Sequence, residues 1–544
     1  MLQDRTPHEP SLRLRVYKLA IAVALTFAAV ALQWHFFQHA GPLWRDEANS
    51  ANLAGLGTWA AIQQHAQYDS FPLVWDVCLW ILANAGWTHD YHLRLFGLLA
   101  AWAQLGALWW AARASGLAVP LVSLVLYALA PSAVVYGTMF RGYGLGAAAF
   151  LIATAMLVRF VQAPSLLRAT ALALANIAAL QSNFANGVLL AATHTAAALS
   201  SWRSKGQWVR TCALLAVAFG LTAASLGLCW SWIRYALEVG SAEQRPVQLA
   251  AIAAVWWESL GTTSVAALLP LWLGALLCTS TTLWQCVRRS PGRYPSCVLA
   301  LAAAFTVAMM LVYFWQVARL PSQQWHYLSL NALLALASDT ALHRWLTTRR
   351  QSVQALAFTA IAACGAVVAW QSWPLVAVRM TNVDLIANVI ERQAKSNDLV
   401  VVAPWYCGLS FARYYRGAAP WITLPDLPDH RFHYHLQIRA KIALGDDGTA
   451  EERLRIQKTL QAGGRVWLVG DLTAPPPGAP APTMPRGPHP VTGWRAGPYL
   501  DAWEMQVAAL LRDHAEEIWG VELPPAGTIN PWENLRLTVI EGWR

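Results

Sequence analysis

No charged residue interrupts the stretch from Leu19 to Phe37, LAIAVALTFAAVALQWHFF. A helix needs roughly 20 apolar residues to cross the hydrocarbon core of a membrane, so this stretch predicts a membrane-spanning helix. The polar run Gln33-Trp34-His35 near its end is unlike the small-residue site at which signal peptides are cleaved. We therefore expect this stretch to be the first helix of the folded protein.

Similar charge-poor runs recur along the first two thirds of the chain. The composition agrees, because 56% of the residues are hydrophobic and 12% are charged, against about 25% charged in ordinary globular domains. The sequence predicts a polytopic α-helical membrane protein with about eleven transmembrane helices. The ten later runs are approximately Leu93–Ala112, Leu117–Val135, Gly142–Val158, Ala169–Leu180, Phe184–Leu199, Thr211–Ile233, Ser264–Leu283, Val298–Val317, Tyr327–Leu342 and Val353–Trp370.

Lysine and arginine are enriched in alternate loops, which is typical of the cytoplasmic side of a membrane protein. This pattern predicts a cytoplasmic N-terminus and, with an odd number of helices, a C-terminus outside. The long outer loops contain amphipathic segments, Leu53–His65 and Val247–Leu260, that we expect to lie along the membrane interface. The basic residues are Arg5, Arg13, Arg15 and Lys18 before the first helix, then Arg113, Arg159, Arg168, Arg203, Lys205, Arg210, Arg288, Arg289, Arg293, Arg344, Arg349 and Arg350.

The composition changes beyond Trp373. Helix and strand patterns alternate there, which predicts a soluble α/β domain over residues 373–544, after a transmembrane domain over residues 1–372 with interfacial helices in the loop 38–92. We expect helices at Asn382–Gln393, Leu409–Tyr415, Glu451–Gln461 and Tyr499–Trp519, and strands at Leu399–Ala403 and Arg465–Val469.

Other functional classes lack support in the sequence. The basic residues do not gather on one face, so the net charge of +10 indicates membrane topology and not a nucleic-acid partner. Seven of the eight cysteines lie in or beside apolar runs without CxxC spacing, so we expect neither a disulfide framework nor a zinc site. No phosphate-binding G-x-x-x-x-G-K-[ST] run occurs.

The residues most indicative of chemistry follow the first helix, in Leu43-Trp44-Arg45-Asp46-Glu47-Ala48. Two adjacent carboxylates beside a membrane surface are costly unless they are solvated or used. A structural alternative is a helix N-cap followed by an acidic first turn, which would need no catalytic role.

The Asp46-Glu47 pair in the first outer loop resembles membrane glycosyltransferases that use polyprenyl-phosphate sugars, the GT-C superfamily that includes protein O-mannosyltransferases and the lipid A aminoarabinose transferase. The resemblance implies that Asp46 is the catalytic base. It assigns Glu47 to positioning sugar or acceptor, and Arg45 to substrate binding.

Three further segments carry the resemblance. Tyr68-Asp69-Ser70-Phe71-Pro72-Leu73 matches an Asp followed by a His-Pro-Pro-Leu-like run, although the histidine and first proline are absent, and a plain turn explains it equally well. Arg141 and Tyr143 match an Arg-x-Tyr at the outer mouth of a helix, where Arg141 would bind phosphate unless it only reaches towards lipid headgroups. Arg319, His326 and Tyr327 lie where relatives have Pro-Arg-Tyr, with His326 in place of the arginine.

The resemblance implies an inverting transfer from a polyprenyl-phosphate sugar, of a hexosyl or pentosyl group, to a lipid, glycan or protein acceptor. The expected location is the outer face of the bacterial inner membrane, with the α/β domain in the periplasm. No cofactor is implied with certainty, no residue is assigned to a metal, and a divalent metal stays open. The alternatives are a transporter or flippase for lipid-linked sugars and a catalytically inactive envelope scaffold.

Overall fold

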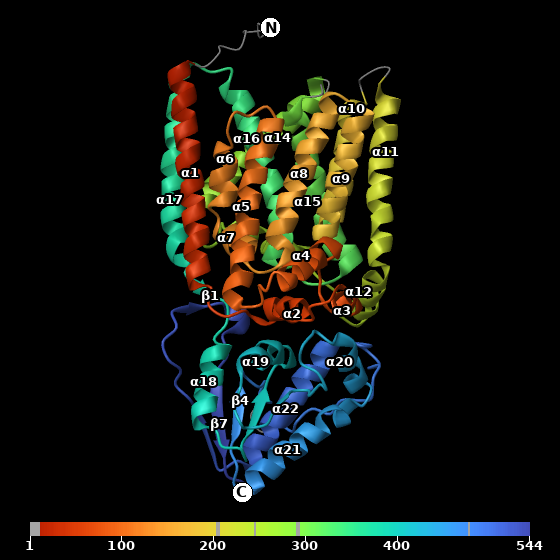
Figure 1. The fold of residues 1–544 in the computed structure, drawn as a ribbon, viewed down its shortest axis with the longest axis vertical. Helices are drawn as coiled ribbons and strands as arrows, with labels where there is room; N and C mark the ends of the chain where they lie inside the picture. Colours follow the sequence, from red (N-terminus) through yellow and green to blue (C-terminus); the bar gives the residue numbers. More distant parts are fainter. Residues whose placement is uncertain (1–10, 203–206, 244–245, 290–293, 477–478) are drawn as a thin grey trace.

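The computed structural model describes residues 11–202, 207–243, 246–289, 294–476 and 479–544. It consists of a bundle of long helices with a smaller α/β domain at one end, and α1 begins at the opposite end of the bundle (Figure 1). We call the end that carries the α/β domain the domain-facing end. The long bundle helices are α1 Leu12–His39, α5 Asp90–Ala114, α8 Gly142–Gln162, α9 Leu166–Ser182, α10 Asn186–Ser201, α11 Trp208–Ala224, α14 Leu268–Arg289, α15 Pro295–Val312, α16 Leu328–Leu346 and α17 Gln351–Val376.

The protein is a membrane protein by the length and composition of its helices. Within the described residues, six helices are long and apolar enough to cross a membrane, or seven if one bent pair forms a single span. The predicted count of eleven is not confirmed, because helices such as α9 and α10 are short although they stand beside the spanning helices (Figure 1). The six are Leu12–His39, Asp90–Ala114, Gly142–Gln162, Trp208–Gly240, Pro295–Ala318 and Gln351–Val376.

The predicted single helix over Leu117–Val135 is wrong. The chain forms α6 Leu121–Ser123 and a π-helical stretch, η2 Leu124–Ala128, and then turns by 73° into α7 Pro131–Thr138. Pro131 lacks a backbone N–H and favours an extended conformation at Ala130, so it starts a new helix. The segment that follows α7 contains Phe140 and Arg141.

Short helices cover the domain-facing end of the bundle (Figure 1). The predicted helix Leu53–His65 is interrupted, because Gly55 ends α2 and Thr58 caps α3. Val247–Leu260 is confirmed as a helix, α13. These short elements are α2 Arg45–Ala54, α3 Trp59–His65, η1 Ala66–Tyr68, α4 Leu73–Asn84, η3 Ser225–Cys229, α12 Trp230–Glu243, α13 Leu249–Ser259, η4 Tyr313–Ala318 and η5 Gln324–Tyr327.

The α/β domain follows α17, and the predicted combination of helices and strands forms a sheet with helices on both faces. Its five-stranded sheet has the order β3-β2-β4-β7-β5, with β2 parallel to β3 and β4, and β7 antiparallel to β4 and β5. The strands are β2 Leu399–Val402, β3 Trp421–Thr423, β4 Val466–Val469, β5 Glu517–Gly520 and β7 Leu537–Glu541, and β1 Val378–Arg379 pairs separately with β6 Thr528–Ile529.

Alternate residues of β2 face opposite sides of the sheet and bury two helical layers. Val400 and Val402 pack with α18 and α19, whereas Leu399 and Val401 pack with α21 and α22. The predicted helix Tyr499–Trp519 is too long, since α22 ends at His514 and Trp519 lies in β5. The helices are α18 Val383–Gln393, η6 Trp405–Cys407, α19 Gly408–Tyr414, α20 His435–Ile442, η7 Gly445–Thr449, α21 Ala450–Gln461, α22 Ala496–His514 and η8 Pro531–Glu533.

The α/β domain docks on the bundle through an apolar surface. Trp405, Phe432 and Tyr434 are buried in the same hydrophobic cluster as Trp44 and Trp75 of the helical part. Polar contacts surround this surface, among them the ion pair of Arg413 on α19 with Asp90 at the start of α5. The two parts therefore share one continuous core at the domain-facing end.

One cysteine pair differs from the expectation of no disulfide. Cys286 near the end of α14 and Cys297 at the start of α15 form a disulfide that joins the two helices. Their separation of eleven residues matches no disulfide or metal motif, so only the antiparallel packing of the helices brings them together.

Candidate active site

Helix α2 places Asp46 at the domain-facing end of the bundle. Gly41 has a positive φ of 63° and turns the chain sharply after α1, and Pro42 follows it. The acidic residues Asp46 and Glu47 then occupy the first turn of α2, where the helix dipole favours negative charge. The structural alternative, in which an acidic residue of this pair is the N-cap, is wrong in that part, because the N-cap is Trp44 and both acids lie in the first turn.

Asp46 is the half-buried member of the pair. Its side chain is 22% exposed, and Oδ1 lies 3.4 Å from Nε2 of His433 and 3.9 Å from Nε of Arg45. Burial by itself would raise the pKa of Asp46, but the hydrogen bond with His433 and the positive charges of Arg141 and Arg45 outweigh it and hold the pKa well below its usual range. Asp46 is therefore ionised at neutral pH.

Glu47 points into the protein. Its side chain is fully buried, and Oε1 lies 2.5 Å from Nη1 of Arg94 on α5 and accepts a hydrogen bond from the backbone N–H of Phe140 at 2.8 Å. Arg94 also donates to the backbone oxygens of Gly41 and Pro42. This ion pair fastens the start of α2 to α5 and to the segment before Arg141.

Arg141 connects three parts of the site. Its Nη1 donates to the backbone oxygen of Asp46 at 2.8 Å, to Oγ of Ser50 at 2.7 Å and to Oδ1 of Asp69 at 2.8 Å. Ser50 in turn donates to Oδ2 of Asp69 at 2.6 Å. The arginine side chain is 4% exposed and lies over the ring of Phe71. The structure thus brings Asp46, Asp69 and Arg141 together, as the motifs suggest.

Arg45 and Tyr68 face the α/β domain. The backbone N–H of Arg45 donates to Oε2 of Glu533 at 2.9 Å, and its Nη1 donates to the backbone oxygen of Trp532 at 2.7 Å. The ring of Tyr68 packs edge-on against Tyr434 at 4.7 Å. Both side chains form part of the contact between the bundle and the α/β domain.

Tyr143 lies in the first turn of α8 and is buried against Phe71, with ring centroids 4.9 Å apart. It also contacts Trp325, whose ring lies 6.0 Å from Trp44 at the start of α2. Trp325 therefore links the loop before α16 to the segment that carries Asp46. This aromatic residue has no counterpart among the sequence motifs.

The three predicted residues of the loop before α16, Arg319, His326 and Tyr327, lie outside the cluster around Asp46. Tyr327 is fully buried and His326 stacks on Phe314 at 5.2 Å, and burial lowers the pKa of His326 to about 4, so it is neutral at pH 7. Arg319 is exposed and has a positive φ of 51°, and within the described residues no contact joins it to Asp46 or Arg141. The structure therefore does not bring these three residues into the cluster around Asp46.

His433 is the main site residue that the sequence motifs miss. It belongs to the α/β domain, and its backbone N–H donates to Oδ1 of Asn49 at 3.1 Å. Asn49 follows Asp46 by three residues on α2, so the same helix face presents both to the domain. The run His433-Tyr434-His435 is a visible signal, but nothing in its spacing places it beside Asp46.

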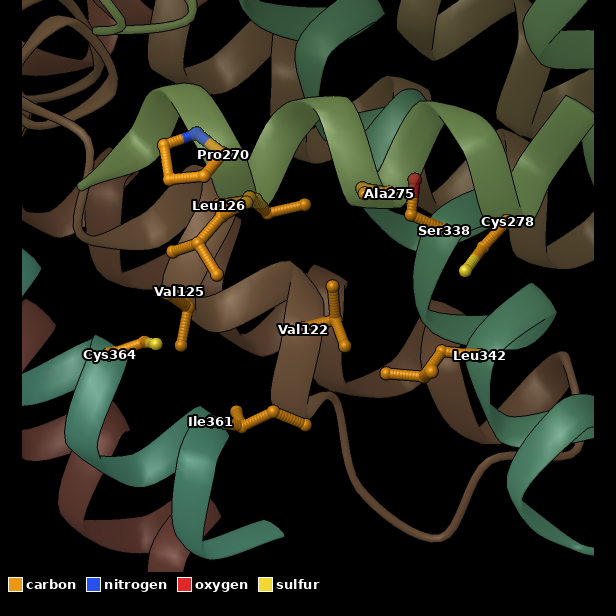
Figure 2. A pocket seen from close by; sticks show the side chains of 12 residues that line it. Val122, Val125, Leu126, Pro270, Ala275, Cys278, Ser338, Leu342, Ile361 and Cys364 are labelled. Atoms are coloured by element: carbon orange, nitrogen blue, oxygen red, sulfur yellow. The ribbon is translucent and has the colours of Figure 1, made fainter. Parts of the chain in front are cut away.

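Neither a metal cluster nor the apolar cavity between the helices adds to this site. Among the described residues, no group of three or more His, Cys, Asp or Glu side chains could hold a metal ion. A cavity of about 250 Å³ lies elsewhere, between the helices (Figure 2). Its lining is almost wholly apolar, for example Val125, Leu271 and Ile361, and it contains no residue of α2 or of the α/β domain.

No protein-family model and no curated protein matches this sequence. Among solved structures, the chain is similar to ArnT from Cupriavidus metallidurans bound to undecaprenyl phosphate, with a TM-score of 0.47 and 13% identity over 82% of this chain and 92% of that chain. It is also similar to the Archaeoglobus fulgidus oligosaccharyltransferase in complex with zinc and sulfate, with a TM-score of 0.47 and 10% identity over 82% of this chain and 67% of that chain.

Proposed function

We propose that the protein is a glycosyltransferase that moves a sugar from a polyprenyl-phosphate carrier to an acceptor hydroxyl at the outer face of the bacterial inner membrane. The observation that carries the proposal is the position of Asp46, an ionised carboxylate at one end of a membrane bundle with Arg45 and Arg141 beside it. A lipid-linked substrate would meet water, a base and positive charge together there.

Sugar transfer from a polyprenyl phosphate requires few catalytic groups from the protein. Glycosidases require a carboxylic acid because an alcohol leaves, and it must be protonated as the bond breaks. A polyprenyl phosphate leaves as a stabilised anion, so the protein must only neutralise phosphate charge, align the acceptor and remove its proton. In this proposal Asp46 is the general base of an inverting displacement.

The surrounding residues take supporting roles in the proposal. Arg141 and Arg45 supply positive charge near the departing phosphate, with paired hydrogen bonds available from the guanidinium fork. Asp69 and Ser50 hold Arg141 in place, and the buried pair Glu47–Arg94 fixes the start of α2. We assign Glu47 to positioning Asp46 because its side chain has no exposed surface.

The sugar and the acceptor are best identified in cells. Mass spectrometry of envelope glycans and glycoproteins, with and without the protein, should reveal one sugar modification that depends on it. The wild-type gene should restore that modification, and the Asp46→Asn variant, expressed at the same level, should not. Restoration by Asp46→Asn would remove Asp46 from the role of base.

A further inference from the structure

The loop before α20 of the α/β domain places an imidazole against the candidate base. Nε2 of His433 lies 3.4 Å from Oδ1 of Asp46, and the side chains are 17% and 22% exposed, respectively. No other histidine among the described residues makes a salt-bridge contact with Asp46. The two residues are separated by almost the whole membrane domain in sequence, so only the docking of the α/β domain creates the pair.

Several contacts fix the orientation of His433. Its backbone is held by Asn49 of α2 at 3.1 Å, and its ring stacks on His435 with centroids 5.8 Å apart. Trp405 packs edge-on against both rings, at 6.3 Å from His433 and 5.6 Å from His435. His433 is held through its backbone and through the faces of its ring, so its orientation is fixed. The ring edge with Nε2 is left to contact Asp46.

Asp46 by itself would not retain the proton that it removes from the acceptor. Its pKa is kept low by the neighbouring His433, Arg141 and Arg45, in spite of burial, so a proton taken from an acceptor would leave Asp46 readily. Efficient general bases have a pKa near the working pH, as an ordinary imidazole does. Burial lowers the pKa of His435 to about 3, so this stacked neighbour stays neutral.

We propose that His433 of the α/β domain is the second member of a proton-accepting pair and takes over the proton that Asp46 removes from the acceptor. This inference rests on the proposed function and deepens it. It gives the α/β domain a catalytic role, because the pair exists only while that domain is docked on α2.

The transfer reaction exchanges one bond of the anomeric carbon for another. The acceptor oxygen forms a bond to the anomeric carbon, and the bond from that carbon to the phosphate oxygen breaks, so that the polyprenyl phosphate leaves with the electron pair. The acceptor proton moves to the carboxylate of Asp46 and then to Nε2 of His433, the ring nitrogen that faces Oδ1 of Asp46, which can accept it in the tautomer that carries its hydrogen on Nδ1. The imidazolium finally releases the proton to water, to which the side chain is partly exposed.

The experiment measures transfer by the full-length protein in liposomes, with a synthetic polyprenyl-phosphate sugar and the acceptor found in cells. His433→Gln should lower kcat by about 100-fold or more, the usual contribution of a general base, with the KM for the donor nearly unchanged. Imidazole added to His433→Ala should restore part of the rate and should have no effect on Asp46→Ala. A purely structural role for His433 would not give this rescue.

The matched control is Asn52→Ala. Nδ2 of Asn52 donates to the backbone oxygen of Arg431 at 2.8 Å, so this variant removes a contact between α2 and the same loop without touching the pair. It should keep a kcat close to that of the wild type. A kcat of His433→Gln within about threefold of the wild type, or equal losses in His433→Gln and Asn52→Ala, would overturn the inference.

The same assay separates this inference from the function on which it rests. If the wild type transfers sugar and His433→Gln does so equally well, only the pair is refuted and the glycosyltransferase stands. If the wild type transfers no sugar from the lipid donor, both the proposed function and the proposed role of His433 are refuted.

Discussion

Arg141 is the residue on which the candidate site converges, since one guanidinium nitrogen contacts the backbone of Asp46 and the side chains of Ser50 and Asp69. If this arginine also neutralises the donor phosphate, Arg141→Ala should raise the KM for the lipid donor by at least about tenfold, because a charge-assisted hydrogen bond contributes about 1.5 to 3 kcal/mol. Initial transfer rates over a range of donor concentrations measure this.

Ser50→Ala is the control for Arg141. It removes two hydrogen bonds from the same network but leaves the positive charge, so the KM for the donor should change little. Thermal unfolding of both variants shows whether the buried Asp69, left without its cation in Arg141→Ala, has destabilised the fold. An unchanged KM in a folded Arg141→Ala protein would count against phosphate binding.

Glu533, buried beside Arg45 where the α/β domain meets α2, should make the stability of the folded protein depend on pH. Burial raises its pKa from 4.5 to about 7, against the opposing charge of Arg45. Between these values the folded state keeps a proton that the unfolded state releases, so the stability from this group is full below pH 4.5 and falls as the pH rises to about 7. The loss is on the order of 3 kcal/mol.

Glu533→Gln cannot titrate, so relative to the wild type it should gain stability as the pH rises from about 5 to about 8. Melting temperatures of the two purified proteins, compared at each pH, measure this. The comparison cancels the contributions of other groups, such as His326 and His435, whose lowered pKa values favour the folded state more as the pH rises. A melting-temperature difference that does not depend on pH would contradict the assignment.

The sequence predicts the residues of this site only where a local motif carries them. Asp46, Asp69 and Arg141 stand in short outer-loop segments and do come together. His433 and Glu533 could not be found in this way, because their positions depend on how a second domain docks. The full burial of Glu47 was also invisible, since adjacent acids on a helix face in different directions and the partner, Arg94, lies on another helix.

At the scale of helices, α5 and the segment after α7 approach closely at Gly97. A Cβ atom at this position would lie 2.3 Å from the carbonyl oxygen of Thr138 and 2.8 Å from that of Met139. The two carbonyls directly precede Phe140 and Arg141, which bind Glu47 and Asp46. Gly97→Ala should therefore lower both the melting temperature and the transfer rate, by displacing the segment that holds α2.

Gly106→Ala on the same helix is the matched control. A Cβ atom there has no neighbour within 4 Å, and alanine favours a helix over glycine by about 1 kcal/mol. This variant should melt at the same temperature as the wild type or higher and keep its activity. If Gly97→Ala behaved in the same way, the close approach would not support the site.

Element types were largely predictable and element ends were not. The helices α18 and α21 and the strands β2 and β4 follow their predicted positions because their apolar periods are clear. The run Leu117–Val135 failed since composition alone does not show that Pro131 turns the chain by 73°. Trp519 was assigned to a helix because the apolar pattern continues past His514, where pairing of β5 with β7 decides the outcome.

For the whole molecule, the start of α1 at Leu12 and the α/β domain lie at opposite ends of the bundle (Figure 1). With a cytoplasmic N-terminus, this predicts a periplasmic α/β domain. Asp447→Cys on the α/β domain should react with a membrane-impermeant maleimide on spheroplasts, whereas Thr348→Cys, in the turn between α16 and α17, should react only after permeabilisation. The reverse result would place Asp46 in the cytoplasm, and labelling of the wild type gives the background from its native cysteines.

The composition predicts a change of organisation near Trp373, where the charge-poor runs end, and α17 ends at Val376. The docking of the α/β domain on the helical bundle could not be predicted from the sequence. It depends on an apolar surface shared by the two parts, including Phe432 and Tyr434, and such a surface has no period or motif in one sequence. A site built at this junction is visible only once both parts are seen together.

Transfer of labelled sugar by the purified protein in liposomes tests the central claim most directly. The assay supplies a polyprenyl-phosphate sugar and the acceptor, and compares the wild type with Asp46→Asn, which keeps the shape of the side chain but not its charge. The account predicts transfer by the wild type, with inverted configuration at the anomeric carbon, and a rate lower by about 100-fold or more in the variant. Equal transfer by the two proteins would contradict it.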